Sequence, residues 1–175
     1  MVLRITIVVM LFIAAILVFA ATKPKTFHLR RSVTIKAAPD NVFALINDLH
    51  KWNEWSEGDD DDPRVQRTFS GSPAGAGAVS EWHGSGKTGA GRMLITESIP
   101  SQKIAIIVDF AKPFKARNVN VFTLEAAGDS TNVFWEFTGE YVYVLKVMTI
   151  FVSPDRIMGK HFQTGLENLK RVAER

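Results

Sequence analysis

The chain has 175 residues, a formal net charge of +3 and no cysteine. An apolar content of 46% is normal for a globular protein and excludes a disordered one. The lack of cysteine excludes disulfides, thiolate metal sites and cysteine nucleophiles, and the scattered Lys and Arg residues do not indicate a nucleic-acid binder.

The N-terminal segment predicts a helix that spans a membrane. Ile5 to Ala21 contains no charged residue, and as a helix it would extend about 26 Å, close to the ~30 Å hydrocarbon core of a bilayer. We therefore expect residues 1–22 to form a single-pass anchor. The small-residue sequence Val18-Phe19-Ala20 leaves a cleaved secretion signal as the alternative, and the flanking basic residues leave the side of the membrane open.

A linker at residues 23–27 precedes one expected domain over residues 28–175, because a chain of this length suits a single core. From His28 onwards, alternation predicts a half-buried strand in which one face carries Leu29, Arg31, Val33 and Ile35. A helix is expected after Pro39, with the apolar stripe Val42, Phe43, Leu45, Ile46 and Leu49. Trp52 and Trp55 then share one face of a second, short helical turn.

The run Asp59 to Asp62 does not have the pattern of a calcium loop. Such a loop alternates its acidic residues and carries Gly at its sixth and Glu at its twelfth position, whereas these four carboxylates are consecutive. We expect a solvated acidic loop there, and neither a metal site nor a cofactor in the chain.

Six alternating segments with turn signals between them predict a meander of antiparallel strands. The segments are Arg64–Ser70, Ala78–His83, Arg92–Ile99, Lys103–Phe110, Arg117–Ala126 and Thr131–Tyr141.

Between the second and third of these segments lies Gly86-Lys87-Thr88, which resembles the end of a phosphate-binding loop. Glu81 occupies the place of the first glycine of that motif, and a strand pattern follows where a helix is required. The glycines therefore indicate a flexible hairpin connection and not a nucleotide site.

The chain ends in a long amphipathic helix, introduced by Ser153 and Pro154. Its apolar stripe consists of Ile157, Met158, Phe162, Leu166, Leu169 and Val172. Gly159 and Gly165 lie near this stripe, although a mid-helix glycine costs about 1 kcal/mol, so either a strand passes close to them or a cavity needs the room. The element order predicts an α+β fold in which a curved seven-stranded antiparallel sheet wraps around the C-terminal helix.

Four segments resemble the START-type, helix-grip superfamily called SRPBCC, and within it the polyketide cyclase/dehydrase-like branch. They are RSVTIKAAPDNVFALINDLHKWNEWS, GRMLITES, DFAKPFKARN and GKHFQTGLENLK, and the resemblance covers Phe27 to the C-terminus. It implies a cavity between sheet and helix and, with the anchor, a place in a bacterial inner membrane. It implies no particular activity, because fold does not fix function.

Alternation along the strands selects the residues that would line this cavity. The apolar candidates are Trp82, Met93, Ile95, Val108, Phe110, Phe122, Trp135, Phe137 and Phe162, for each of which core packing is the alternative. The polar candidates are Glu97, Asn118 and Asn120. The asparagines are expected to hydrogen-bond a ligand carbonyl or to satisfy backbone groups near a strand end. Glu97, if buried without a partner, would suit a general acid or base; a rim position or a salt bridge with Arg92 or Arg117 is its alternative.

The apolar segment Glu140–Ser153 is expected to cover the cavity entrance, to contact the bilayer, or to pack in the core. His161 would lie at the cavity mouth, and the four histidines lack metal-ligand spacing.

The leading hypothesis is a membrane-anchored domain that binds a small hydrophobic or amphipathic ligand, lipid-like or aromatic, with no nucleic-acid partner and an oligomeric state left open. The alternatives are a polyketide cyclase or dehydratase that uses Glu97 as general acid/base, and a scaffold whose cavity is vestigial.

Overall fold

The computed structural model describes residues 2–56, 65–84, 89–112, 114–151, 153 and 155–175. The acidic run Asp59–Asp62 and the Lys-Thr pair of the glycine-rich connection lie outside these residues.

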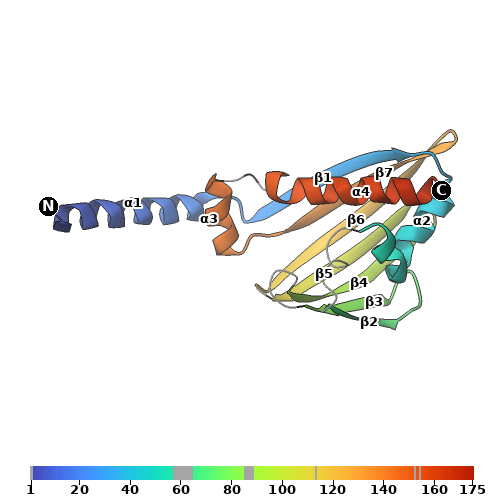
Figure 1. The fold of residues 1–175 in the computed structure, drawn as a ribbon, viewed down its shortest axis with the longest axis horizontal. Coiled ribbons are helices and arrows are strands. Elements are labelled where there is room, and N and C mark those ends of the chain that lie inside the picture. The colour runs from blue at the N-terminus through green and yellow to red at the C-terminus, as the bar shows by residue number, and fades with distance from the viewer. Residues whose placement is uncertain (1, 57–64, 85–88, 113, 152, 154) are drawn as a thin grey trace.

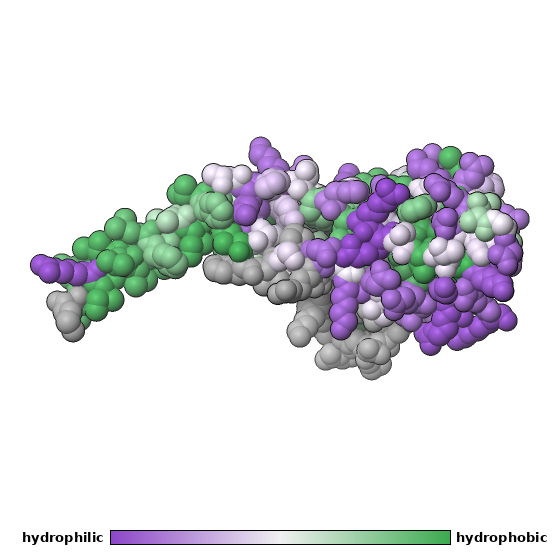
Figure 2. Space-filling view, turned by 90° about the horizontal axis from the view of Figure 1, so that it is seen from above, coloured by the Kyte–Doolittle hydropathy of each residue, from purple (hydrophilic) through white to green (hydrophobic). Residues whose placement is uncertain are grey.

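The first helix, α1 (Val2–Thr22), projects from the rest of the molecule as a single rod (Figure 1). Its large apolar side chains are exposed, and within it only Ala20 is buried. Figure 2 shows this rod as a hydrophobic surface beside a domain whose visible face is rich in hydrophilic residues. By length and composition α1 is able to cross a membrane.

The domain is built on one antiparallel sheet of seven strands in the order β1-β7-β6-β5-β4-β3-β2. The strands are β1 (Thr26–Ile35), β2 (Gln66–Gly71), β3 (Ala78–His83), β4 (Ala90–Ile99), β5 (Lys103–Lys112), β6 (Ala116–Ala127) and β7 (Ser130–Glu140). Strands β2 to β7 follow one another as the predicted meander, and β1 pairs with β7 along its whole length. The predicted fold is confirmed.

Two helices cover one face of this sheet, which we call the inner face (Figure 1). They are α2 (Pro39–Asn47), which is followed by the 3-10 helix η1 (Leu49–Glu54), and α4 (Lys160–Ala173), which is preceded by the π turn η2 (Asp155–Gly159). The helix α3 (Tyr143–Phe151) lies instead at the end of the sheet, against α1. The C-terminal helix packs chiefly on β1, and its buried side chains are Phe162, Leu166 and Leu169. The regular α-helix thus begins at Lys160, after a π turn that the sequence pattern did not indicate.

Gly159 and Gly165 both lie where a side chain from a strand comes close. Of the two explanations offered for these glycines, close approach of a strand is therefore the one that the structure supports. A Cβ on Gly165 would come 3.1 Å from the ring of Trp135, so the glycine lets α4 approach β7. A Cβ on Gly159 would collide with the guanidinium of Arg31, which reaches from β1 to an ion pair with Asp155.

Two tryptophans bind the short helices to the core. The indole N–H of Trp52 donates to the carbonyl of Ile46 at 2.9 Å, and that of Trp55 donates to the carbonyl of Leu45 at 3.1 Å. These carbonyls end α2 and have no partner within the helix. The indoles therefore complete the helix end while their rings enter the core, and the short helical turn predicted around them is confirmed as η1.

Candidate functional site

The inner face of the sheet carries nearly all the residues that the sequence selected. The side chains of Trp82, Met93, Ile95, Val108, Asn118, Asn120, Phe122, Trp135, Phe137 and Phe162 are all buried. Phe110 is partly buried and its ring meets that of Trp82 edge-on, with centroids 5.7 Å apart. The strand parity that we read from the sequence is therefore correct for this set, while its role in binding a ligand stays a prediction.

Glu97 is the exception, and its expected inward position is wrong. The register of β4 against β5 shifts between Ile95 and Glu97, where a β-bulge inserts one extra residue. A shift of one residue moves the following side chains to the opposite face. Glu97 therefore pairs in register with Ala105 on the outer face, its side chain is 42% exposed, and its carboxylate forms an ion pair with Lys103 at 2.6 Å. It cannot act on a ligand held against the inner face.

Close to α2 and η1, the space between the sheet and the helices is filled by aromatic side chains. The ring of Trp135 stacks on Phe122 at 4.8 Å and meets the rings of Trp52 and Trp55 edge-on at 6.5 and 5.9 Å. The amide oxygen of Asn120 accepts a hydrogen bond from the indole N–H of Trp135 at 2.7 Å. The predicted hollow thus does not extend into this half, because the two tryptophans of η1 insert there.

The other half of the inner face, towards α3, is lined by a continuous row of rings. Phe162 of α4 lies 5.0 Å from Phe137, Phe137 lies 5.3 Å from Phe27, and Phe27 lies 5.1 Å from Tyr141. We call these four residues the aromatic row. Burial raises the pKa of Tyr141, which lies at the end of the row that adjoins α3.

Asn118 lies beside this row and has an unsatisfied polar atom. It is 6% exposed, and its Oδ1 has no hydrogen-bond partner among the described residues. Its strand neighbours in register are Val108 and Gly139. A Cβ on Gly139 would collide with the amide of Asn118 and come 3.0 Å from the ring of Phe27. The glycine therefore leaves the space that the amide of Asn118 occupies.

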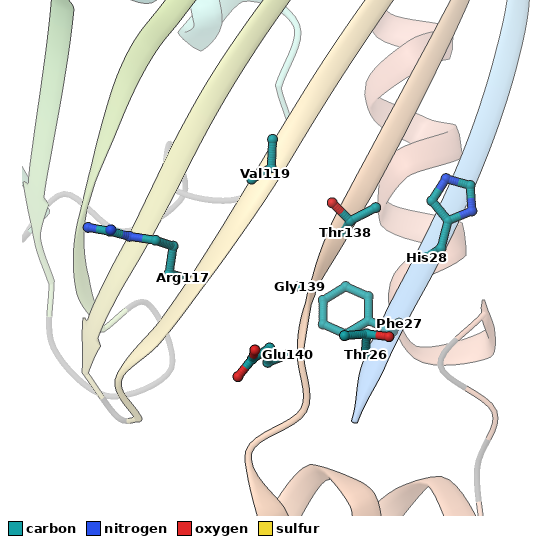
Figure 3. Close-up of a pocket in the computed structure, with 8 residues that line it drawn as sticks. All are labelled: Thr26, Phe27, His28, Arg117, Val119, Thr138, Gly139 and Glu140. Carbon is teal, nitrogen blue, oxygen red and sulfur yellow. The ribbon is translucent and has the colours of Figure 1, made fainter. Parts of the chain in front are cut away.

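A groove of about 430 Å³ is open at the same end of the sheet (Figure 3). It is lined by Thr26, Phe27, His28, Arg117, Val119, Thr138, Gly139 and Glu140. A second hollow of about 380 Å³ lies at the turn from β5 to β6. Most of the residues that line the first groove alternate with the buried ones along their strands. This groove therefore belongs to the outer face of the sheet and is distinct from the hollow that the sequence predicts.

The outer face carries cross-strand ion pairs. The guanidinium of Arg117 donates to both carboxylate oxygens of Asp109, at 2.6 and 3.0 Å. This hydrogen bonding, together with the charges of Arg117 and Arg92, holds the pKa of Asp109 below its usual value against a smaller effect of burial. Among the described residues, no three His, Asp or Glu side chains gather as metal ligands would.

The sequence analysis missed Phe27 and Gly139 as parts of this site, whereas Tyr141 belongs to the segment Glu140–Ser153 that we expected at the cavity entrance. Phe27 has the same parity as Leu29, but it was assigned to the linker, whereas β1 begins at Thr26. Extending the alternation by two residues would have found it. Gly139 offered no signal, because a glycine's role here depends on which amide lies opposite it.

Comparison with solved structures supports the same architecture. Protein CV1439 from Chromobacterium violaceum has a TM-score of 0.60 and 15% identity, over 87% of this chain and 99% of that one. Mll3558 from Rhizobium loti has a TM-score of 0.58 and 20% identity, over 85% and 99%. The KanY protein has a TM-score of 0.59 and 19% identity, over 87% and 100%. At these identities the likeness shows the fold alone.

No curated protein sequence matches the chain. Residues 26–174 do match the family described as "Polyketide cyclase / dehydrase and lipid transport". This span includes every strand of the sheet, the aromatic row and α4. The chain therefore belongs to the polyketide cyclase/dehydrase and lipid transport family, within the SRPBCC superfamily of helix-grip folds.

Proposed function

We propose that this protein is a membrane-tethered binding domain for a small amphipathic molecule that carries a hydrogen-bond donor. The observation on which this depends is the buried Oδ1 of Asn118 beside the aromatic row, which has no hydrogen-bond partner in the described part of the chain. Buried polar atoms in native proteins are nearly always paired, and leaving one unpaired costs about 1–3 kcal/mol. A ligand hydroxyl or N–H that donates to Asn118 removes this cost.

The surroundings of Asn118 favour an apolar body on such a ligand. Phe27 lies near the amide across Gly139, its ring is followed in the row by those of Phe137 and Phe162, and Val108 lies on the neighbouring strand. Binding sites for small molecules are mostly apolar with few orienting polar groups. The description of the family, which names both cyclases and lipid transport, agrees with a ligand of this kind.

The tether is supported by the way α1 joins the domain. Ala20 is fully buried, and the hydroxyl of Tyr143 donates to the carbonyl of Leu17 at 2.7 Å. Leu17 precedes the Val18-Phe19-Ala20 sequence that resembles a cleavage site, and Ala20 is its last residue. Cleavage there would remove contacts that the folded domain makes, which favours a retained anchor over a secretion signal.

The enzyme alternative loses its general acid/base, because Glu97 lies on the outer face. No other described carboxylate lies among the buried residues of the inner face. We therefore propose binding, not turnover, as the function of the site.

The test compares the binding of two probes that share the naphthalene ring system, β-naphthol and its bulkier methyl ether, to full-length protein purified in detergent. Only β-naphthol donates a hydrogen bond. One hydrogen bond contributes about 0.5–1.5 kcal/mol, so wild type should bind β-naphthol roughly two- to tenfold more tightly. Asn118→Leu should abolish this preference. Equal affinities of the two probes for wild type would contradict the proposal.

A further inference from the structure

The helix α3 connects the sheet to the C-terminal segment, and it lies directly against the C-terminal end of α1 (Figure 1). Besides the hydrogen bond from Tyr143 to Leu17, the ammonium of Lys146 donates to the carbonyl of Lys23 at 3.4 Å. The side chain of Lys146 is buried. A cation at the C-terminal end of a helix interacts favourably with its dipole. Two contacts, one turn apart on α3, thus fix it to α1.

The direction of α3 follows from the same picture. Figure 1 shows α3 running across the axis of α1, whereas α4 and the strands beside it run roughly along that axis. A helix that crosses a membrane span at its end lies in the plane of the membrane surface. The orientation of α3 is therefore that of an interfacial helix.

The point along α1 at which α3 makes contact also agrees with an interfacial position. At 1.5 Å per residue, the span Val2–Thr22 is about 31 Å long, which matches a hydrocarbon core of ~30 Å. Leu17 precedes the end of α1 by about 7.5 Å. Interfacial helices bury their apolar face about 5–10 Å into the boundary between headgroups and acyl chains, so the contact with Leu17 lies at the depth where such helices bind.

The exposed surface of α3 is apolar. Tyr143, Val144 and Met148 are 48%, 49% and 46% exposed, and Val144 and Met148 are one helical turn apart on the same side. In water this surface would be an uncovered hydrophobic patch. Tyrosine is enriched at the membrane interface because its ring prefers the acyl boundary and its hydroxyl prefers the headgroups.

Basic residues surround the same junction. Lys23 follows the end of α1, and its ammonium lies over the ring of Phe19, 4.8 Å from the centroid. Lys25 follows after one proline, and its carbonyl accepts a hydrogen bond from the N–H of Tyr141. Lysine side chains at the ends of membrane helices extend towards the headgroups, and lysines near the surface favour anionic lipids.

We propose that α3 is an in-plane helix that rests on the lipid leaflet, with Val144 and Met148 at the acyl boundary and the lysines among anionic headgroups. This inference rests on the proposed tether, because α1 supplies the depth. It sets the long axis of the domain upright on the membrane and places the Tyr141 end of the aromatic row next to the lipid. An amphipathic ligand would then pass from the leaflet to Asn118 without crossing water.

The absence of cysteine allows single labels at chosen positions. We would introduce Val144→Cys and Met148→Cys separately into the full chain, attach an environment-sensitive fluorophore, and reconstitute the protein into phosphatidylcholine vesicles with and without phosphatidylglycerol. Leu11→Cys in α1 and Ile99→Cys, at the end of β4 away from α3, are the controls. Phosphatidylcholine that carries a spin label near its headgroup or deep in its acyl chain then quenches the fluorophore at that depth.

Labels at positions 144 and 148 should lose most of their fluorescence to the shallow quencher, more so with phosphatidylglycerol. The label at position 11 should respond to the deep quencher and that at position 99 to neither. If positions 144 and 148 behave like position 99 while position 11 is quenched, the tether stands and α3 does not rest on the leaflet. If position 11 is not quenched, the tether itself fails.

Discussion

Asn118 and Asn120 provide a matched pair for testing whether an unpaired amide marks the binding site. They lie two residues apart on the inner face of β6, and they are 6% and 5% exposed. The Oδ1 of Asn120 accepts the indole N–H of Trp135, whereas the Oδ1 of Asn118 has no partner among the described residues. The same substitution should therefore change stability in opposite directions.

The magnitudes follow from the cost of an unpaired buried polar group, about 1–3 kcal/mol. Asn118→Leu removes such a group and keeps a similar side-chain volume, so we expect the ligand-free protein to gain about 1 kcal/mol. Asn120→Leu leaves the indole N–H of Trp135 unpaired and should cost about 1–3 kcal/mol. The two variants should thus differ by roughly 2–4 kcal/mol, with about 2–4 °C in Tm for each kcal/mol.

Urea unfolding of the full chain in detergent, followed by tryptophan fluorescence, measures both changes after bound small molecules have been removed. Asn118→Leu should unfold at a higher urea concentration than wild type and Asn120→Leu at a lower one, with similar slopes. Equal destabilisation by both substitutions would refute the reasoning, because it would mean that the amide of Asn118 is already satisfied in the folded domain.

Three further predictions concern the rest of the sheet. Gly91→Ala should destabilise the domain by about 1–3 kcal/mol in urea unfolding, because the new Cβ would collide with the ring of Trp82 and lie 2.7 Å from the carbonyl oxygen of Asp109; an unchanged midpoint would contradict this. Arg117→Gln should raise the pKa of Asp109 towards its ordinary value in a carboxyl NMR titration. Because the pKa of Asp109 is lowered in the folded state, its contribution to stability is present at neutral pH and is lost as the pH falls through that lowered value. The variant should lose less stability over this pH range. A titration curve of Asp109 identical to that of wild type would contradict the role of the ion pair. Glu97→Gln should leave the affinity for β-naphthol unchanged. A loss of binding would contradict this and show that the Glu97 carboxylate takes part in the site.

Alternation along the chain predicted the sheet because period-two patterns report directly which face of a strand is buried. The pattern ArgMetLeuIleThrGluSer, however, looks like an uninterrupted strand although it contains a bulge at Thr96. A bulge depends on how two strands pair and not on either strand alone. The assignment of Met93 and Ile95 was therefore right, and that of Glu97, beyond the bulge, was wrong.

The side chains that fill the space between the sheet and α4 were harder to predict than the strand residues that line it. Trp52 and Trp55 had the right spacing for a helical turn, but nothing in that spacing shows that their rings fill half of the interior. The segment Glu140–Ser153 was recognisably apolar, yet its helix α3 and its packing on α1 depend on contacts between residues more than a hundred positions apart. Tertiary packing of this kind leaves no local pattern.

Native mass spectrometry of the full chain released from lipid nanodiscs tests the central claim most directly, namely that Asn118 and the aromatic row hold an amphipathic ligand. Wild type and Glu97→Gln should both carry a small molecule or take up β-naphthol, and Asn118→Leu should carry roughly two- to tenfold less of it at a limiting concentration. A wild-type protein that emerges without any bound molecule, and stays so after incubation with β-naphthol, would contradict the account.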